Sequence, residues 1–491
     1  MTFPVVLDAV ARVLREAGLL TELRGDADTE VSGVAHDSRA VRRGDLFLAW
    51  KGILADGHDF APAAAAAGAT AMVVERALPE IELPQLVVSD GRHAAALAAD
   101  AVMGLPGRDL NAVAVTGTNG KTTTALLTRH VLSTRPEGAA AVGTLGVVGP
   151  DGRVWSGTEG LTTPDPVSLA RWLRRLVDEG TTTVVMEASS HALDQHRLDA
   201  IPFRVAVFTN LSRDHLDYHG SLEAYRASKL RLLELLRDDG TVVVNAADPA
   251  WRGIDAPSLL TYAVREPADL RAENVVLSPR GTRFTLHFRD EAVPVSLPLL
   301  GSFNVENALA AIGAGLALGV PLEAAARRLE DAPQIPGRME RILETPFTVV
   351  VDFAHTPDAL ENLLRAVRAV TQGRLVVLFG AGGDRDRGKR EPMAQAVARH
   401  ADRIFLTSDN PRTEDPERIL DDLEPGLGQA DHVREADRRS AIRQAVAEAM
   451  EGDVLVLAGK GHETYQVIGT EKHPFDERAE VMEALKLRGA A

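Results

Sequence analysis

Cysteine is absent from this chain of 491 residues. The absence excludes disulfide bonds, thiolate zinc sites and cysteine nucleophiles. Aromatic residues are also few, at 4% of the sequence, whereas 45% of the residues are hydrophobic. The hydrophobic cores must therefore be built mainly from alanine, valine and leucine. A chain of this length is expected to form about three domains.

Positively charged residues are scarce as well, since 54 lysines and arginines stand against 70 acidic residues. The formal net charge of −16 repels phosphate backbones, so we expect no nucleic-acid partner. Long uncharged apolar runs are missing, and the first helix-like segment carries Asp8, Arg12, Arg15 and Glu16. We therefore expect no secretory segment, no membrane partner and a cytoplasmic location.

Apolar runs alternate with glycine or acidic turns and amphipathic helices, an order typical of an α/β protein. Helices are expected near residues 61–67 and 93–102. Prolines and glycines interrupt the pattern at 105–107 and 333–337, which predicts domains at 1–106, 107–336 and 337–491. The apolar runs predict strands at residues 46–50, 71–74, 183–186, 204–208, 241–244, 348–351, 375–379, 404–407 and 454–457.

The segment from Val113 to Thr124 joins an apolar strand to a glycine turn, a lysine and a hydroxyl at a helix start. The amides of such a turn and the positive end of the helix favour a polyanion. Lys121 is placed to reach terminal phosphates, and Thr122 offers an oxygen to Mg²⁺. A strict P-loop would have glycine where this chain has Val115, so we predict a variant phosphate loop. An ordinary strand-to-helix turn is the alternative interpretation.

Polar residues follow two strands that should neighbour the phosphate-loop strand. Glu187 follows the strand at 183–186, and His215 lies in the polar run 209–219. Ligands of α/β sheets bind beyond the carboxyl ends of the strands, so we predict a metal role for both residues, with a structural ion pair as the alternative. His191 and His219 are interpreted as hydrogen-bonded scaffold residues.

Lys229 lies in the segment 225–236, whose pattern predicts an amphipathic helix. Periodicity alone makes Lys229 a solvated residue. In the last third of the chain, strand ends carry charged loops at 352–357, 380–390, 409–412 and 459–463. Within these loops Arg390 and Arg412 are suited to grip a carboxylate or phosphate with two hydrogen bonds.

Together these motifs resemble the Mur ligases, and in particular the branch that adds the third amino acid to UDP-N-acetylmuramoyl-L-alanyl-D-glutamate. The resemblance runs from about Asp37-Ser38-Arg39 to beyond Glu463, and the variant phosphate loop fits the Mur form. It implies an N-terminal UDP-substrate-binding domain, a central P-loop-type ATPase domain and a C-terminal Rossmann-like domain. The motifs lie at 116–123, 209–219, 301–304, 336–340, 352–357, 409–412 and 459–463.

The resemblance also implies roles for individual residues. The UDP-muramoyl-peptide is expected at His36, Ser38, Thr162, Thr163, Ser189, Gln195 and Arg197, with a weaker match at 53–55. Leu161 stands where relatives often have asparagine. ATP is expected at Gly117, Thr118, Asn119, Gly120, Lys121, Thr122, Thr123, Asn304, Arg338 and Asp352. The incoming amino acid is expected at Arg390, Asp409, Asn410, Pro411, Arg412, Gly459 and Glu463.

Catalysis is expected from Lys121, Glu187, His215 and Lys229, with Lys229 carbamylated to N6-carboxylysine. Mg²⁺ is expected at Thr122, Glu187, His215 and the carbamylated Lys229. The implied reaction passes through an acyl phosphate formed from ATP and the D-glutamate carboxylate. We expect a monomer whose third domain closes on the second during the reaction.

Several interpretations of the substrate remain open. The segment 409–412 favours meso-2,6-diaminopimelate, with Arg412 on its distal carboxylate, and L-lysine or L-ornithine is the alternative. A folylpolyglutamate synthase would share the phosphate loop but should lack the paired motifs at 409–412 and 459–463. A non-catalytic nucleotide-binding scaffold would not need Lys121, Glu187, His215 and Lys229 together.

Overall fold

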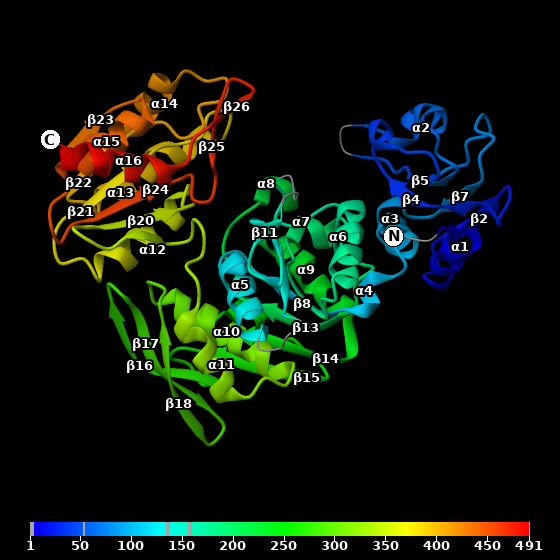
Figure 1. Cartoon of the computed structure of the whole chain (residues 1–491), viewed down its shortest axis with the longest axis horizontal. Coiled ribbons are helices and arrows are strands. Elements are labelled where there is room, and N and C mark those ends of the chain that lie inside the picture. Colours follow the sequence, from blue (N-terminus) through cyan, green and yellow to red (C-terminus); the bar gives the residue numbers. More distant parts are fainter. Residues whose placement is uncertain (1–3, 53–54, 134–137, 156–159, 491) are drawn as a thin grey trace. The chain divides into compact units, whose positions relative to one another are not determined.

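The computed structural model describes residues 4–52, 55–133, 138–155 and 160–490 (Figure 1). The chain divides into two compact units. The first comprises Met1–Arg271, His287–Glu291 and Glu306–Ala325, and the second comprises Ala272–Leu286, Ala292–Val305 and Ala326–Ala491. Among the described residues, no helix is long and apolar enough to cross a membrane.

The first unit begins with a five-stranded sheet in the order β2-β7-β6-β5-β4. Alternate residues of its strands face opposite sides, so Leu46 and Leu48 pack with the helices α1 and α3, whereas Phe47 packs with α2. The bounds are α1 (Leu7–Glu16), β2 (Leu20–Arg24), β4 (Gly33–Ala35), β5 (Asp45–Leu48), α2 (Ala61–Ala67), β6 (Ala71–Val74), β7 (Gln85–Val88) and α3 (Gly91–Val102). A separate pair is formed by β1 (Val5–Val6) and β3 (Glu30–Val31).

The larger sheet of the first unit places the phosphate-loop strand at its centre. β8 (Asn111–Thr116) lies between β12 (Thr183–Glu187) and β13 (Phe203–Phe208), and both neighbours run parallel to it. Glu187 pairs with Val115, and Phe208 pairs with Thr116. The segments that follow these three strands therefore leave the sheet at the same edge, as the sequence predicted.

The order of this eleven-stranded sheet is β11-β10-β9-β12-β8-β13-β14-β15-β16-β17-β18. Its further strands are β9 (Ala140–Gly143), β10 (Gly146–Val148), β11 (Val154–Trp155), β14 (Leu236–Asn245), β15 (Ser258–Ala263) and β16 (Leu270–Ser278). Its helices are α4 (Pro106–Asp109), α5 (Lys121–Leu132), α6 (Pro166–Asp178), α7 (Ser190–Asp194), α8 (Leu216–His219) and α9 (Leu222–Leu230). The two units share β16, β17 (Gly281–Phe288), β18 (Glu291–Leu297), α10 (Phe303–Ala317) and α11 (Leu322–Arg328).

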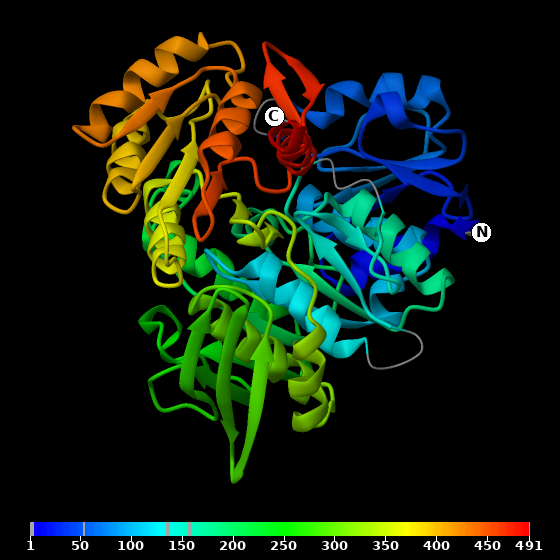
Figure 2. The ribbon, with the colours of Figure 1, turned by 60° about the vertical axis from the view of Figure 1, so that its left-hand side comes forward.

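The second unit holds a six-stranded sheet in the order β19-β20-β24-β21-β22-β23, in which only β19 is antiparallel to its neighbour. Helices α12, α13 and α14 pack on one face, and α15 and α16 pack on the other, as Figures 1 and 2 show in yellow to red. Val377 and Leu378, neighbours in β21, face these two opposite cores. The sheet is therefore covered on both sides, as expected for parallel strands.

The bounds of this unit are β19 (Glu340–Leu343), β20 (Thr348–Asp352), α12 (Pro357–Arg368), β21 (Leu375–Phe379), α13 (Arg390–Ala398), β22 (Arg403–Leu406), α14 (Pro416–Leu423), β23 (His432–Arg434), α15 (Arg438–Glu448), β24 (Val454–Ala458), β25 (Tyr465–Ile468), β26 (Glu471–Pro474) and α16 (Glu477–Ala490). β25 and β26 form a separate antiparallel hairpin.

The predicted helix over 225–236 is wrong in its second half. The α-helix α9 ends at Leu230, a 3-10 turn covers Arg231–Leu235, and β14 starts at Leu236. The reason is that Leu236 already pairs with Phe203 of β13, so the chain must leave the helix to enter the sheet. The strand expected at 46–50 is also shorter than predicted and ends at Leu48.

Candidate active site

The phosphate loop connects β8 to α5 through two glycines with positive φ. Gly117 has φ of +146° and Gly120 has φ of +84°, and Gly120 is the residue that caps α5. A Cβ atom at Gly117 would lie 1.9 Å from Thr209 Oγ1, so the loop has no room for a side chain there. The first turn of α5 starts directly after the loop with Lys121, as an anion-binding helix end requires.

The segment after β13 holds the phosphate loop in place. Asn210 accepts hydrogen bonds from Thr118 N through its carbonyl oxygen (2.7 Å) and from Asn119 N through Oδ1 (2.9 Å). Thr209 Oγ1 donates to Asn119 O at 2.7 Å, and Ser212 N donates to Thr118 Oγ1 at 3.0 Å. The polar run 209–219 therefore shapes the loop as well as following a neighbouring strand.

Two lysines converge on one backbone oxygen of this loop. Lys121 Nζ donates to Gly117 O at 2.9 Å and to Thr118 O at 2.8 Å, and Lys229 Nζ reaches Gly117 O at 2.8 Å from α9. The side chain of Lys229 is fully buried, with its ammonium 4.4 Å from the ring centre of Tyr225. The solvated position that periodicity predicted for Lys229 is therefore wrong, because α9 packs with this face against the phosphate loop.

Burial lowers the pKa of Lys229 well below its ordinary value, and the nearby charge of Lys121 lowers it further. Both effects favour the neutral amine. An unprotonated amine is the form that reacts with CO₂ or another electrophile, so Lys229 is suited to covalent modification.

Glu187 lies at the end of β12 with 2% of its surface exposed. Its Oε2 accepts a hydrogen bond from Thr122 Oγ1 at 3.0 Å, and its Oε1 accepts one from Thr144 N at 2.8 Å. The structure thus brings together two of the predicted metal ligands, both with oxygen donors of the kind that Mg²⁺ prefers. His215 is exposed, and its contacts are with Asp214 and the rings of His191 and Tyr225.

Four of the residues predicted to bind the muramoyl-peptide form one network behind Glu187. Thr163 Oγ1 donates to Glu187 O at 2.7 Å and contacts Ser189 Oγ at 3.2 Å. Arg197 donates to Thr163 O at 2.9 Å and to Gln195 Oε1 at 2.7 Å. Burial lowers the pKa of Arg197, with Asp165 opposing this effect.

The other predicted peptide and nucleotide contacts are spread more widely. Thr162 Oγ1 lies within hydrogen-bonding distance of Thr144 Oγ1, at 3.3 Å. His36 and Ser38 lie on the segment between β4 and β5, where the His36 ring stacks on Trp50 with centroids 5.7 Å apart. Of the weaker match at 53–55, Ile53 and Leu54 lie outside the described residues.

His191 is a half-buried histidine at the start of α7. Its ring contacts those of His215, Tyr218 and His219. Burial, with the charges of His215, His219 and Arg197, lowers the pKa of His191 to about 4, although Asp217 opposes the shift. His219 bonds to Ser190 Oγ at 3.0 Å, consistent with the scaffold role predicted for both histidines.

In the second unit, a buried polar network joins the loops after β22 and β24. Asn410 Nδ2 donates to Glu463 Oε2 at 2.9 Å. Lys460 Nζ donates to Asn410 Oδ1 at 3.0 Å and to Glu463 Oε2 at 3.1 Å, with its side chain fully buried. A Cβ atom at Gly459 would lie 2.6 Å from Asp409 Oδ2, so these two loops meet closely. Five predicted amino-acid contacts therefore gather here, namely Asp409, Asn410, Pro411, Gly459 and Glu463.

The two arginines predicted to grip carboxylates have different surroundings. Arg390 is 1% exposed, and its guanidinium donates to both carboxylate oxygens of Glu414, at 2.9 and 3.1 Å, and to Asp422 at 2.7 Å. Arg412 is half-buried and donates to Gly383 O at 2.8 Å. Its backbone has φ of +52° and is held by bonds to Val467 O and from Gly469 N.

The predicted ATP contacts of the second unit lie near its first strands. Arg338 lies 4.9 Å over the ring of Phe353. Asp352 accepts backbone hydrogen bonds from Met339 and Ala354, both at 2.7 Å. Burial raises the pKa of Asp352, while Arg338 and these donors oppose the rise. Asn304 is 3% exposed and donates to Leu300 O at 2.7 Å.

Sequence reasoning missed several residues that shape these sites. Thr144 binds Glu187 but lies in no motif, and Glu414 binds Arg390 from a loop with no distinctive pattern. Asn210 lies in the motif 209–219 and Lys460 in the motif 459–463. Their position in these motifs was the signal that could have identified both residues.

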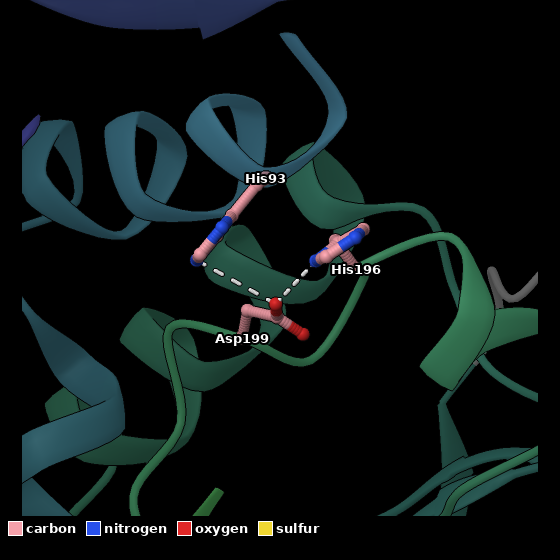
Figure 3. Close-up of side chains that lie close together, drawn as sticks. All are labelled: His93, His196 and Asp199. Carbon is pink, nitrogen blue, oxygen red and sulfur yellow. Dashed lines mark hydrogen bonds and ion pairs between the residues drawn. The ribbon is translucent and has the colours of Figure 1, made fainter. Parts of the chain in front are cut away.

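A separate cluster in the first unit combines two histidines and a carboxylate (Figure 3). Asp199 Oδ2 lies 2.6 Å from His196 Nδ1, 3.5 Å from His93 Nε2 and 3.2 Å from Arg231 Nη2. A metal ion would compete with the guanidinium for this one oxygen. We interpret the cluster as a charge-compensated ion-pair group that joins α3 to the segment after α7.

Three family models match the chain in order. They are the Mur ligase family catalytic domain at residues 30–106, the Mur ligase middle domain at 115–315 and the Mur ligase glutamate ligase domain at 337–461. The three matched segments follow one another along most of the chain.

Curated relatives match along almost the whole chain. UDP-N-acetylmuramoyl-L-alanyl-D-glutamate–2,6-diaminopimelate ligase from Geobacillus kaustophilus (strain HTA426) is 44% identical over 94% of this chain and 96% of the relative. The ligase of the same name from Synechococcus elongatus (strain ATCC 33912 / PCC 7942 / FACHB-805) is 45% identical over the same shares of the two chains. These similarities are high enough to establish the family of this chain.

Solved structures agree with this. A structure of a UDP-N-acetylmuramoyl-L-alanyl-D-glutamate–2,6-diaminopimelate ligase has a TM-score of 0.71 and 35% identity, and the match covers 99% of this chain and 100% of that one. Mycobacterium tuberculosis folylpolyglutamate synthase complexed with ADP has a TM-score of 0.62 at 19% identity, covering 74% of this chain and 91% of that one. The second similarity shows a shared fold alone.

Replacing Gly117 with alanine should weaken ATP binding at least about tenfold, because the new methyl group would push the loop away from Thr209. Titration calorimetry with ATP measures the effect. Gly180→Ala is the matched control, since Gly180 also has positive φ, at +83°, but has nothing within 4 Å of the added Cβ. Equal losses in both variants would show that backbone strain, and not the contact with Thr209, is responsible.

Stability should fall as the pH is lowered from about 7 to 4, and His191 should cause part of the fall. The unfolded chain takes up a proton on this histidine near pH 6.5, whereas the folded protein resists it until about pH 4. Unfolded molecules therefore bind more protons across this window, which favours unfolding. His191→Gln should flatten the pH dependence of urea unfolding, and an unchanged slope would contradict this account.

Proposed function

The chain belongs to the Mur ligase family, and on this premise we propose that it joins meso-2,6-diaminopimelate to UDP-N-acetylmuramoyl-L-alanyl-D-glutamate in peptidoglycan synthesis. As a member of this family it is an ATP-dependent ligase that forms a C–N bond. The observation that carries the proposal is the pair of lysines on Gly117 O, beside the amino end of α5. The Lys121 ammonium and a helix end suit a polyphosphate.

In the proposed reaction, the D-glutamate carboxylate attacks the γ-phosphorus of ATP and releases ADP. Lys121 and the amides of the loop 117–123 stabilise the negative charge that develops on the transferred phosphoryl group. The amino group of diaminopimelate then attacks the acyl phosphate, phosphate leaves and an amide forms. The protein acts mainly by orienting the reactants and stabilising charge. The phosphate that is added to the carboxylate in the first step is itself the leaving group of the second step.

Mg²⁺ is part of this proposal because two oxygen atoms suited to bind it, Thr122 Oγ1 and Glu187 Oε2, lie together at the edge of the phosphate loop. We propose that these two residues, with His215 and the carbamylated Lys229, hold the ion. When bound, Mg²⁺ neutralises phosphate charge. Glu187 is fixed for this role by Thr144, which donates to it from both its backbone and its side chain.

Carbamylation of Lys229 is supported by the chemistry of its surroundings. A buried amine with a lowered pKa is nucleophilic toward CO₂, and the resulting carbamate carries a negative charge. Gly117 O, which accepts a hydrogen bond from Lys229 Nζ, would then accept one from the carbamate N–H. A carbamate beside Lys121 also places a negative charge next to this cation, which is a favourable pairing.

Selection of diaminopimelate is assigned to the second unit. The distal centre of diaminopimelate carries both a carboxylate and an ammonium group. The loops supply Arg412 for the carboxylate and Glu463 for the ammonium group. Arg390 and the residues Asp409, Asn410, Pro411 and Gly459 complete this proposed site. Leaving a fully desolvated arginine unpaired costs about 3–5 kcal/mol. Arg412 is half-buried, so its penalty is smaller, but it still disfavours lysine and ornithine.

The remaining substrate contacts are proposed on the family resemblance. The muramoyl-peptide would contact His36, Ser38, Thr162, Thr163, Ser189, Gln195 and Arg197. ATP would contact Asn304, Arg338 and Asp352 in addition to the phosphate loop. The domain limits 1–106, 107–336 and 337–491 are part of the same proposal.

The substrates are small molecules, and the consumption of ATP supports a cytoplasmic location. The net charge of −16 supports the absence of nucleic-acid partners. That the protein works as a monomer and without a membrane stays a prediction.

A phosphate-release assay with the UDP-muramoyl-dipeptide and a panel of amino acids tests the function. Diaminopimelate should be used at least about tenfold more efficiently than lysine or ornithine. Arg412→Ala should lower kcat/KM for diaminopimelate about a hundredfold and leave that for lysine nearly unchanged. Lys121→Ala is the inactive control. Equal rates for lysine and diaminopimelate would refute the role of Arg412. ATP binding without any release of phosphate would indicate a non-catalytic nucleotide-binding scaffold.

Carbamylation predicts that activity depends on dissolved CO₂. Enzyme depleted of bicarbonate should lose most of its ligase activity and regain it when bicarbonate is restored, because the carbamate forms reversibly. Carbon-13 bicarbonate should give a carbamate signal in the NMR spectrum of the wild type that is missing in Lys229→Arg. A fully active enzyme without this signal would rule the modification out.

A further inference from the structure

A buried ion pair lies beneath the two loops that the proposed function assigns to the incoming amino acid. Arg438 is the first residue of α15 and Glu477 is the first residue of α16. Both side chains are fully buried, and Glu477 Oε1 accepts from Arg438 Nε at 2.8 Å and Nη2 at 2.6 Å. The pair belongs to the second unit and to none of the motifs found in the sequence.

The other hydrogen bonds of the guanidinium go to the backbone at the carboxyl end of the sheet. Arg438 Nη1 donates to Ser408 O at 3.1 Å, and Nη2 donates to Ala458 O at 2.9 Å. Each of these carbonyls belongs to the peptide group that starts a loop, because Asp409 follows Ser408 and Gly459 follows Ala458. One rigid side chain therefore holds the starting points of both loops.

The loops meet again above this pair. Lys460 links Asn410 to Glu463, and Gln466 and Val467 of β25 donate to Asp409 O and Asn410 Oδ1. The separation between the loops is thus fixed from below by Arg438 and from above by Lys460. The lower contact therefore bears on the positions of both loops where they start.

Stability alone gives no reason for this arrangement. A buried ion pair is often no more stabilising than apolar side chains of similar size. The helix dipoles act in opposite directions on this pair, since they disfavour Arg438 at the amino end of α15 and favour Glu477 at the amino end of α16. What the guanidinium offers, and an apolar pair or a lysine does not, is a planar fork that reaches a carboxylate and two carbonyls together.

We propose that the Arg438–Glu477 pair is a positioning element that sets the spacing of the loops 409–412 and 459–463 and so controls binding of the diamino acid. The inference rests on the proposed function of these loops. It assigns the pair no contact with the substrate, so its effect should fall on KM for the amino acid and not on KM for ATP.

Steady-state phosphate release by the full-length protein tests this with three variants. Arg438→Lys keeps the charge but loses the fork, and Glu477→Gln keeps the shape but loses the charge. Each should raise KM for diaminopimelate about tenfold or more while KM for ATP stays within about twofold. The double variant Arg438→Met, Glu477→Leu should keep a melting temperature near that of the wild type and still show the raised KM.

The double variant separates positioning from charge compensation. If the double variant has both the stability and the KM for diaminopimelate of the wild type, the two charges serve only to compensate each other. The proposal is then overturned. Unchanged KM values in Arg438→Lys and Glu477→Gln would overturn it as well. If the double variant does not fold, these two milder variants still decide the question.

Arg374 and Asp453 provide a matched control. They form an arginine–carboxylate pair at 2.7 Å in the same unit, next to the amino ends of β21 and β24, away from the loops. Arg374→Lys should leave KM for diaminopimelate unchanged, and an equal rise there would refute a local role of Arg438. A wild type that releases no phosphate with any amino acid would refute the proposed function instead, so the two failures are distinguishable.

Discussion

The carbonyl oxygen of Gly117 accepts hydrogen bonds from the ammonium groups of Lys121 and Lys229, and the site in the first unit depends on this convergence. Lys121 comes from the helix that continues the phosphate loop, and Lys229 comes from a helix more than a hundred residues later. Their proximity requires β8 to lie at the centre of the sheet and the phosphate loop to have a glycine at position 117. Burial and the charge of Lys121 favour the neutral amine at Lys229, and a carbamate at this position replaces repulsion of Lys121 with attraction.

The second unit handles charge differently. Several of its cations are already matched with acidic groups, as Lys460 is with Glu463, Arg390 with Glu414 and Arg438 with Glu477. Such a balanced network suits a ligand that carries both signs of charge, because each group of the ligand can replace an internal partner. A diamino acid with two carboxylates has this property, whereas a polyphosphate does not. The difference between the units therefore reflects the difference between their proposed substrates.

Much of the α/β framework was predictable because it depends on local patterns. Apolar runs identified β12, β13, β20, β21 and β24, and their polar ends located Glu187 and the loops 409–412 and 459–463. The prediction failed where tertiary contacts override a local pattern. The stretch 225–236 has a helical pattern throughout, yet Leu236 leaves the helix to pair with Phe203. Lys229 looks solvated by periodicity, yet its face of α9 packs on the phosphate loop.

The sequence by itself determined the family, the phosphate loop and the order of the charged strand ends, since each depends on residues close together in the chain. Only the tertiary structure decided which of these residues meet. In the folded chain Thr122 bonds to Glu187, and Glu414 bonds to Arg390. Arg438 bonds to the starts of two loops that are fifty residues apart in the sequence. The physical reason is that a buried charge must find its partners wherever the fold brings them, and no local pattern records that requirement.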